Sequence, residues 1–231
     1  LKKQALILAW VAVLAHFVTL SLSAWEKRGI DFSFFHTASI ISLIIVFMLL
    51  ITSFSRPVEK LGIALFPIAA LMLILDVAYP STVKTTQEYS FAMNTHMLSS
   101  IIAFSLLTIA AFQSLLLALQ NRQLKSRNPG RLMLAFPPLQ AMESLLFQMI
   151  SAGVFFLSIS LLSGFIFIED LFAQHLVHKT ILSIIAWVIF SSLLIGRKRY
   201  GWRGKKAIRL TLYGFVSLLL AYFGSKLMLE L

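Results

Sequence analysis

The sequence predicts an all-α protein, a polytopic membrane helix bundle of seven transmembrane helices that forms a single transmembrane domain over residues 1–231. The chain is 59% hydrophobic and only 13% charged, which is far too apolar for a soluble domain of this length. Its apolar residues gather into seven runs of membrane-spanning length, and its Lys and Arg residues gather between alternate runs. The first pattern predicts the helices and the second predicts their orientation.

Each apolar run is close to the roughly 17–25 residues that a helix needs to cross the hydrocarbon core. Short polar or Pro- and Gly-containing segments separate the runs. A helix in lipid satisfies its own backbone hydrogen bonds, so no strand interpretation competes. The chain does not begin with methionine, and an eighth helix before Leu1 stays open as an alternative. The expected helices cover about 4–24, 34–54, 61–79, 97–119, 146–169, 180–196 and 207–227.

Positive charge orients these helices. With the first end inside, fifteen Lys and Arg residues fall on the cytoplasmic side and five on the outer side. Because Lys- and Arg-rich loops stay in the cytoplasm, the N-terminus is predicted to be cytoplasmic and the C-terminus periplasmic. Topology therefore explains the net charge of +11, and no nucleic-acid partner is predicted. The predicted partner of the whole chain is the lipid bilayer.

Several classes of chemistry are absent from the sequence. The chain has no cysteine, which excludes disulfides, thiolate metal ligands and thiol-disulfide exchange by this chain. It contains no Gly-rich phosphate loop, no hydrolytic triad pattern and no HExxH motif. The sequence therefore predicts a protein that is not an enzyme.

All five histidines fall in the predicted outer half of the protein. His36 and His96 open the second and fourth helices, and His16 is the one most expected to be buried. His175 and His178 lie in a short polar turn before the sixth helix and share a face if that turn is helical. Imidazole is a common ligand of haem iron and transition metals, and ionisable groups in membranes are kept mainly for function. The pattern predicts an outward-facing ligand site, with an interfacial histidine that binds nothing as the alternative for each.

Few charged groups accompany these histidines on the outer side. Arg28 and Lys179 are outer cations that can hold the carboxylates of a ligand. Asp76, near the outer end of the third helix, is expected to be a plain interfacial residue, to accept a proton, or to pair with Lys84 or Arg28.

Two stretches of the chain resemble a known family. They are NTHMLSSIIAFSLLTIAAFQSLLLAL, from Asn94, and HKTILSIIAWVIFSSLLIGRKRYGWRGKKA, from His178, which is followed by a helix ending LAYFGSKL. Both resemble the cytochrome c assembly transmembrane proteins, most closely over about 96–227, and the Gly201-Trp202-Arg203-Gly204 turn is the most specific match. Within that family the chain looks most like the inner-membrane subgroup called YpjD, whose members usually carry eight helices.

The resemblance implies haem chemistry at the outer face of a bacterial inner membrane. His96 matches the family's first external haem-ligand histidine. The family's tryptophan-rich WWD segment is missing, and FIFIEDLFAQHLVH stands between Gly164 and Lys179 in its place. No histidine after the last helix matches the family's second external ligand. His178 lies at the edge of the missing segment, and we infer that it substitutes for that ligand.

The sequence as a whole predicts a haem-binding or haem-handling membrane protein with its site on the extracytoplasmic side. His96 and His178 are the predicted iron ligands, and Arg28 and Lys179 are the predicted partners of the propionates. His16 and His175 are reserve ligands. The alternative is an accessory or transport-type protein for a divalent cation or small ligand, which would use Asp76 and the outer histidines without haem. A third hypothesis for the function is a scaffold that binds only other membrane proteins.

Overall fold

The computed structural model contains helices and turns, with no strand, in the residues that it describes: 2–26, 33–55, 61–80, 91–125, 138–167 and 174–224. Six of these helices are long and apolar enough to cross a membrane. The other, α3 (Gly62–Ala78), has 17 residues and is about 26 Å long, slightly less than the thickness of a typical hydrocarbon core. The predicted all-α membrane helix bundle is confirmed.

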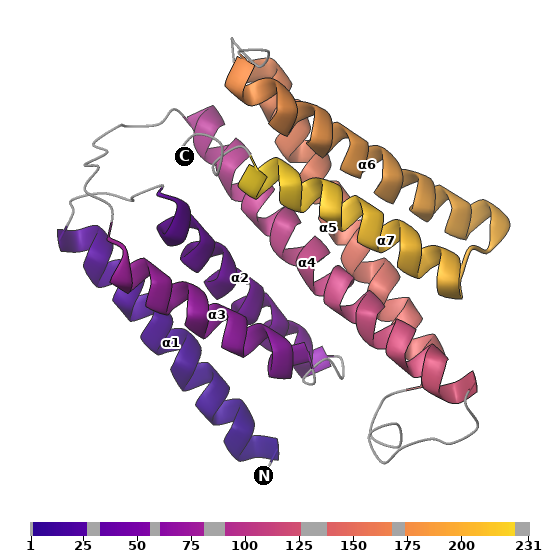
Figure 1. Cartoon of the computed structure of the whole chain (residues 1–231), viewed down its shortest axis with the longest axis horizontal. Helices are drawn as coiled ribbons and strands as arrows, with labels where there is room; N and C mark the ends of the chain where they lie inside the picture. The colour runs from indigo at the N-terminus through magenta and orange to yellow at the C-terminus, as the bar shows by residue number, and fades with distance from the viewer. Residues whose placement is uncertain are drawn as a thin grey trace. The chain divides into compact units, whose positions relative to one another are not determined.

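The chain divides into two compact units, residues 1–89 and 90–231, and each is described by itself. The expectation of a single transmembrane domain stays a prediction. The first unit contains α1 (Lys2–Glu26), α2 (Phe34–Ser55) and α3 (Figure 1). Its middle member is α2, which packs against both of the others. Large apolar side chains of α1 such as Leu8, Phe17 and Leu22 are exposed, as lipid-facing residues are, because lipid tails are as apolar as leucine.

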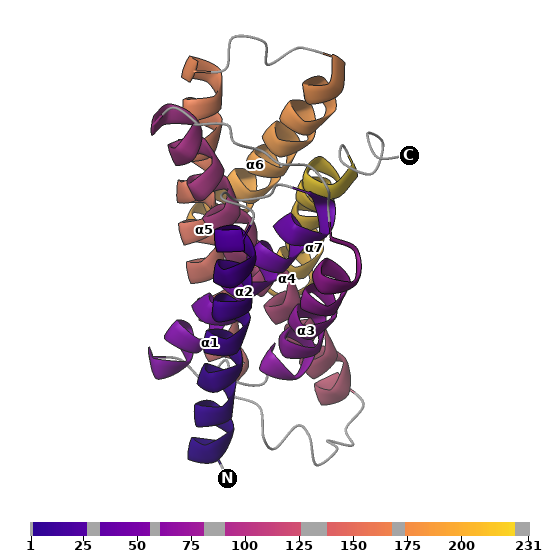
Figure 2. The same ribbon diagram turned by 90° about the vertical axis from the view of Figure 1, so that its left-hand side faces the viewer.

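The second unit is a ring of four helices. It contains α4 (Phe91–Lys125), α5 (Leu139–Phe167), α6 (Gln174–Tyr200) and α7 (Gly204–Leu219), and α7 continues into the short π-helix η3 (Leu220–Gly224) (Figures 1 and 2). Both α4 and α6 pack against α5 and against α7. This is the arrangement of an antiparallel four-helix bundle. The ring encloses fully buried side chains, including Leu107, Ile109, Leu146, Ile150, Phe190, Leu193 and Leu218.

Glycines allow the helices of this bundle to approach closely. A Cβ atom at Gly153 would lie 2.7 Å from the side chain of Leu107, and one at Gly214 would lie 2.8 Å from the ring of Phe190. Association in lipid depends on such close packing, because no hydrophobic effect drives helices together there. Both glycines are therefore packing positions between neighbouring helices.

The turn between α6 and α7 is built around two more glycines. Gly201 (φ 63°) and Gly204 (φ 55°) adopt the left-handed conformation, which suits a residue without a Cβ atom. Gly201 ends α6 by donating its N–H to the Arg197 carbonyl at 3.2 Å, as in a left-handed helix cap. The ring of Trp202 packs onto Gly196, and the Lys206 ammonium lies 3.3 Å from the centre of that ring.

Three helix starts differ from the sequence prediction by six or seven residues, and one of them is the start of the fifth helix, at Leu139 and not at about 146. The fourth helix begins at Phe91, so His96 lies in its second turn. The sixth helix begins at Gln174, so His175 and His178 lie inside it and not in a turn before it. The physical reason is that the segment from Gln174 to Lys179 has no glycine or proline to stop a helix. A hydropathy criterion places a helix end where polar residues begin, whereas the backbone continues until something breaks it.

Candidate functional site

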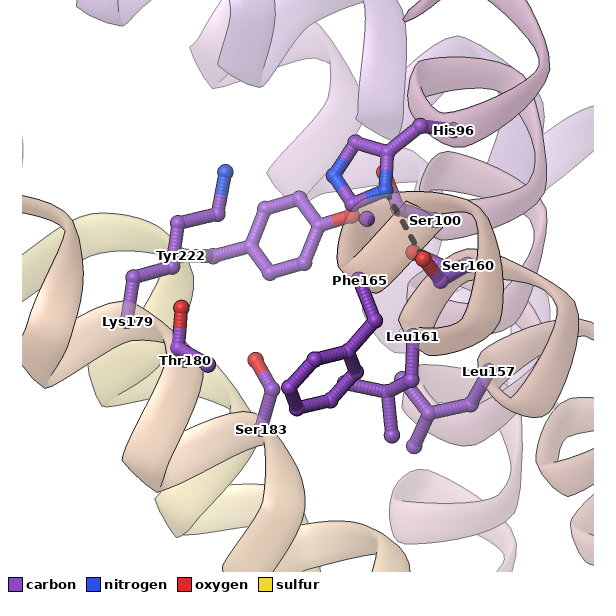
Figure 3. A pocket seen from close by; sticks show the side chains of 11 residues that line it. His96, Ser100, Leu157, Ser160, Leu161, Phe165, Lys179, Thr180, Ser183 and Tyr222 are labelled. Atoms are coloured by element: carbon purple, nitrogen blue, oxygen red, sulfur yellow. Dashed lines mark hydrogen bonds between the residues drawn. The ribbon is translucent and has the colours of Figure 1, made fainter. Parts of the chain in front are cut away.

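A small recess lies in the second unit, where α4, α5, α6 and η3 meet. Its volume is about 70 Å³, which is room for water-sized molecules. Its wall is mainly apolar, with a histidine, a lysine, a tyrosine and several hydroxyls among its members (Figure 3). The lining residues are His96, Ser100, Leu157, Ser160, Leu161, Gly164, Phe165, Lys179, Thr180, Ser183 and Tyr222.

His96 is held by α5. Its Nδ1 lies 2.8 Å from the backbone carbonyl oxygen of Ser160, and this contact is drawn in Figure 3. A carbonyl oxygen can only accept, so the proton is on Nδ1, and Nε2 of the neutral ring keeps its lone pair. Ser163 places its hydroxyl oxygen 3.5 Å from the same Nδ1. Metal-ligating histidines commonly use one ring N–H in this way to orient the other nitrogen.

Lys179 lines the same recess from α6. Its Nζ lies 5.5 Å from the centre of the Tyr222 ring, within the range of a cation–π contact. Two of the predicted site residues, His96 and Lys179, are thus brought to one recess although they are far apart in the sequence. A neutral imidazole nitrogen and an ammonium group facing one space can together receive a ligand that carries both a metal and an anionic substituent.

Tyr222 is a member of the recess that sequence analysis did not single out. Its hydroxyl is buried beside Ser100, and Ser100 donates its own proton to the Met97 carbonyl at 2.9 Å. The tyrosine lies in η3, and short π-helical segments recur at functional sites. Its ring packs against Phe104, with centroids 4.6 Å apart. A tyrosine close to the outer end of the last helix was visible in the sequence, but the π-helix was not.

The other predicted site residues do not line this recess. His178 is exposed on α6, and as the residue before Lys179 it points about 100° away around the helix. Its pairing with His96 stays a prediction. His175 is in the first turn of α6, but its side chain lies outside the described residues, and so does the whole of Arg28. His16 belongs to the first unit, where it is buried and its Nε2 lies 2.9 Å from the Ser39 hydroxyl oxygen.

The first unit also contains a hydrogen-bonded histidine and aspartate pair that sequence analysis missed. Nδ1 of His36 lies 3.0 and 3.2 Å from the two carboxylate oxygens of Asp76, and both side chains are mostly buried. The sequence suggested Lys84 or Arg28 as the partner of Asp76, and both lie outside the described residues. Within the described part of the chain, no three His, Asp or Glu side chains gather as a metal-binding group.

The donor set and the size of the recess in the second unit test whether haem fits there. An imidazole whose Nδ1–H is bound to a carbonyl, a nearby cation and aromatic walls suit an iron porphyrin with carboxylate substituents. Sites that enclose an organic ligand usually measure about 300–1,000 Å³, whereas this recess measures about 70 Å³. The described residues would therefore supply haem with an iron-binding imidazole and one wall, and they do not enclose a porphyrin.

Comparison with known proteins gives one relative matched over the whole chain and others matched over part of it. The chain is 31% identical over its whole length to the inner membrane protein YpjD of Escherichia coli strain K12, and it covers 88% of that protein. It is 36% identical, over 57% of its length, to 49% of an uncharacterized 28.8 kDa protein of Azospirillum brasilense. It is 28% identical, over 47% of its length, to 34% of the cytochrome c biogenesis protein CcsA of Prochlorococcus marinus strain NATL1A. No solved structure matches the chain.

The family match spans both units. The profile of the family described as Cytochrome C assembly protein matches residues 2–231, and so includes the helices that carry His96 and Lys179. The seven described helices and the whole-length relative agree with that match. The chain belongs to the cytochrome c assembly protein family.

Proposed function

We propose that this chain is a non-enzymatic, haem-binding or haem-handling protein of the bacterial inner membrane, with its site on the extracytoplasmic side. The observation that carries the proposal is the fixed imidazole of His96. Its Nδ1 donates to the Ser160 carbonyl at 2.8 Å, which leaves Nε2 as a lone-pair donor beside a recess that also holds Lys179. That nitrogen is the proposed ligand of haem iron.

The other groups of the recess have roles that follow from their chemistry. Lys179 is the proposed partner of a propionate, because an ammonium group in a mainly apolar surrounding attracts a carboxylate strongly. The Tyr222 hydroxyl lines the same recess and is proposed to donate to the same carboxylate. The small volume favours a haem that is bound at an open wall and passed on, because a haem retained permanently is usually enclosed.

The location and orientation rest on separate support. A relative over the whole length is named an inner membrane protein, and the distribution of Lys and Arg supports an N-terminus in the cytoplasm and a C-terminus in the periplasm. Under this topology His96, in the second turn of α4, is at the outer end of its helix. A role connected with cytochrome c assembly is supported by the family and by the relatives named for cytochrome c biogenesis.

The test is a hemin titration of the detergent-purified protein, followed by the Soret absorption. We expect saturation near one haem per chain and a loss of affinity of about 100-fold or more in His96→Ala, since even residues that only support a ligand contribute about 10- to 100-fold. His96→Gly should recover binding when imidazole is added, because the free base can occupy the vacated position. A purely structural histidine would not show that rescue.

Two further histidine variants test which residue is the second ligand of haem iron, and a separate titration tests the alternative function. His178→Ala tests the predicted pairing, and a loss equal to that of His96→Ala would support it. His16→Asn keeps a hydrogen-bonding group for Ser39 and should bind hemin like the wild type. If hemin shows only broad absorbance that does not saturate, the haem proposal is wrong, and titration with divalent cations then tests the cation-binding alternative.

A further inference from the structure

A second recess lies in the four-helix unit, between the end of α4 and the start of α7. Its volume is about 310 Å³, and its lining residues are Ala118, Asn121, Arg122, Lys205, Ile208 and Arg209. Arg122 is 26 positions after His96 on one continuous helix, which corresponds to about 39 Å along its axis. The second recess is therefore remote from the proposed haem site and can be tested independently of it.

Three cations without a counterion face this recess. Arg122, Lys205 and Arg209 are exposed, and none of them takes part in an ion pair among the described residues. Glu143, the acidic residue of the neighbouring helix, is already engaged by Gly204 and Arg197. The sequence has no Asp or Glu over 120–142 or over 196–209. Within the described part of the second unit, no acidic residue forms an ion pair with these three cations.

Helix geometry concentrates this charge. Lys205 and Arg209 are four residues apart on α7 and so share one face, and Arg122 is in the last turns of α4, which packs against α7. Lys205 also stands in the first turn of α7, where the helix dipole is positive and a cation is unfavourable. An anion in the recess would offset both the mutual repulsion and the dipole. The Asn121 amide adds a possible hydrogen-bond donor.

The arrangement of polar and apolar lining residues indicates the kind of anion. Ala118 lies one turn before Arg122 on α4, and Ile208 lies three residues after Lys205 on α7, so each is deeper in the bilayer than that one cation, while Arg209 lies beside Ile208. A lipid has the same sequence of parts, a phosphate above an acyl chain. We propose that this recess binds the phosphate headgroup of an anionic lipid in the cytoplasmic leaflet, where Lys and Arg clusters recognise such lipids.

The test measures lipid binding to the full chain in a neutral detergent at physiological salt. Thermal unfolding is followed by tryptophan fluorescence while phosphatidylglycerol, phosphatidylcholine or sodium phosphate is added. We expect a saturable rise in melting temperature with phosphatidylglycerol alone. With about 1 kcal/mol for each basic residue, removing all three cations as Arg122→Gln, Lys205→Gln and Arg209→Gln should weaken binding roughly 100-fold.

A matched control removes equal charge from the same side of the protein. Lys198, Arg199 and Arg203 are exposed and do not line the recess, so their triple Gln variant should bind phosphatidylglycerol like the wild type. A charge-keeping variant, with Arg122→Lys, Lys205→Arg and Arg209→Lys, should retain most of the binding. Equal losses in the two Gln triples would overturn the proposal, because charge alone would then explain the effect. Saturation by sodium phosphate with no further effect of lipid would overturn the lipid assignment.

Discussion

Glu143 is predicted to hold the turn between α6 and α7. It is buried on α5, where its Oε1 accepts the Gly204 N–H at 2.7 Å and its Oε2 lies 3.8 Å from Nη1 of Arg197. The first contact is a short charge-assisted hydrogen bond to the first residue of α7. The second is an ion pair that is too long to be a hydrogen bond. One carboxylate thus joins the end of α6, the start of α7 and the neighbouring α5.

Two substitutions separate these contributions. Glu143→Gln can keep an acceptor for the Gly204 N–H and loses the charge, so we expect a cost of about 1–2 kcal/mol. The Arg197 side chain is 29% exposed, and water therefore screens the lost ion pair. Glu143→Ala removes the acceptor as well and leaves the Gly204 N–H without its partner, for a cost of about 2–4 kcal/mol.

Thermal unfolding of the purified protein measures both costs. For a chain of this size, 1 kcal/mol corresponds to about 2–4 °C, so we expect a decrease of roughly 3–6 °C for Glu143→Gln and about 10 °C for Glu143→Ala. Ser144→Ala, at the exposed neighbouring position, is the control and should change stability by less than about 0.5 kcal/mol. Equal decreases for the two Glu143 variants would show that the acceptor is unimportant. No decrease in either would refute the role assigned to this carboxylate.

Three further predictions concern packing and polar contacts inside the two units. Gly214→Ala should destabilise the second unit by about 1–3 kcal/mol, because the new methyl group would lie 2.8 Å from the fully buried Phe190 ring; an unchanged melting temperature would contradict this. Asp76→Asn should cost about 1–2 kcal/mol by weakening the charged contact with His36, while hemin affinity stays that of the wild type. Trp187→Phe removes the hydrogen bond of 2.8 Å that the Trp187 indole on α6 donates to the Ser158 hydroxyl on α5. A double-mutant cycle of these two residues should give a coupling energy near 0.6 kcal/mol. A coupling energy of zero would show that the contact is not made.

The sequence analysis predicted the helices with small errors at their ends. Length and hydropathy are local properties, so each transmembrane run can be recognised without knowing its neighbours. The expected run over 34–54 and the observed α2 (Phe34–Ser55) differ by one residue. The error was larger where polar residues continue a helix beyond the membrane, as at Gln174 to Lys179 in α6. Backbone hydrogen bonding continues through such residues, although hydropathy no longer marks them.

The sequence predicted which types of residue form the site, but it identified only some of the residues that line it. His96 and Lys179 were selected from the sequence, and both line one recess. The contact that gives His96 its proposed role joins it to a carbonyl 64 residues later in the chain. Every residue has such a carbonyl, so no pattern of side chains marks the one that is used. Tyr222 was missed for a related reason, because its orientation depends on a short π-helix.

What the sequence determined by itself is the solvent of each segment: which runs lie in lipid, which ends carry the positive charge, and on which side the histidines are expected. Those properties follow from transfer free energies and charges that each residue carries wherever it is placed. Which groups meet, such as His36 with Asp76 and Glu143 with Gly204, became visible in the folded structure alone. The physical reason is that a lipid-spanning helix is apolar nearly all round, so its rotation and its partners are set by close packing between helices and by single polar contacts.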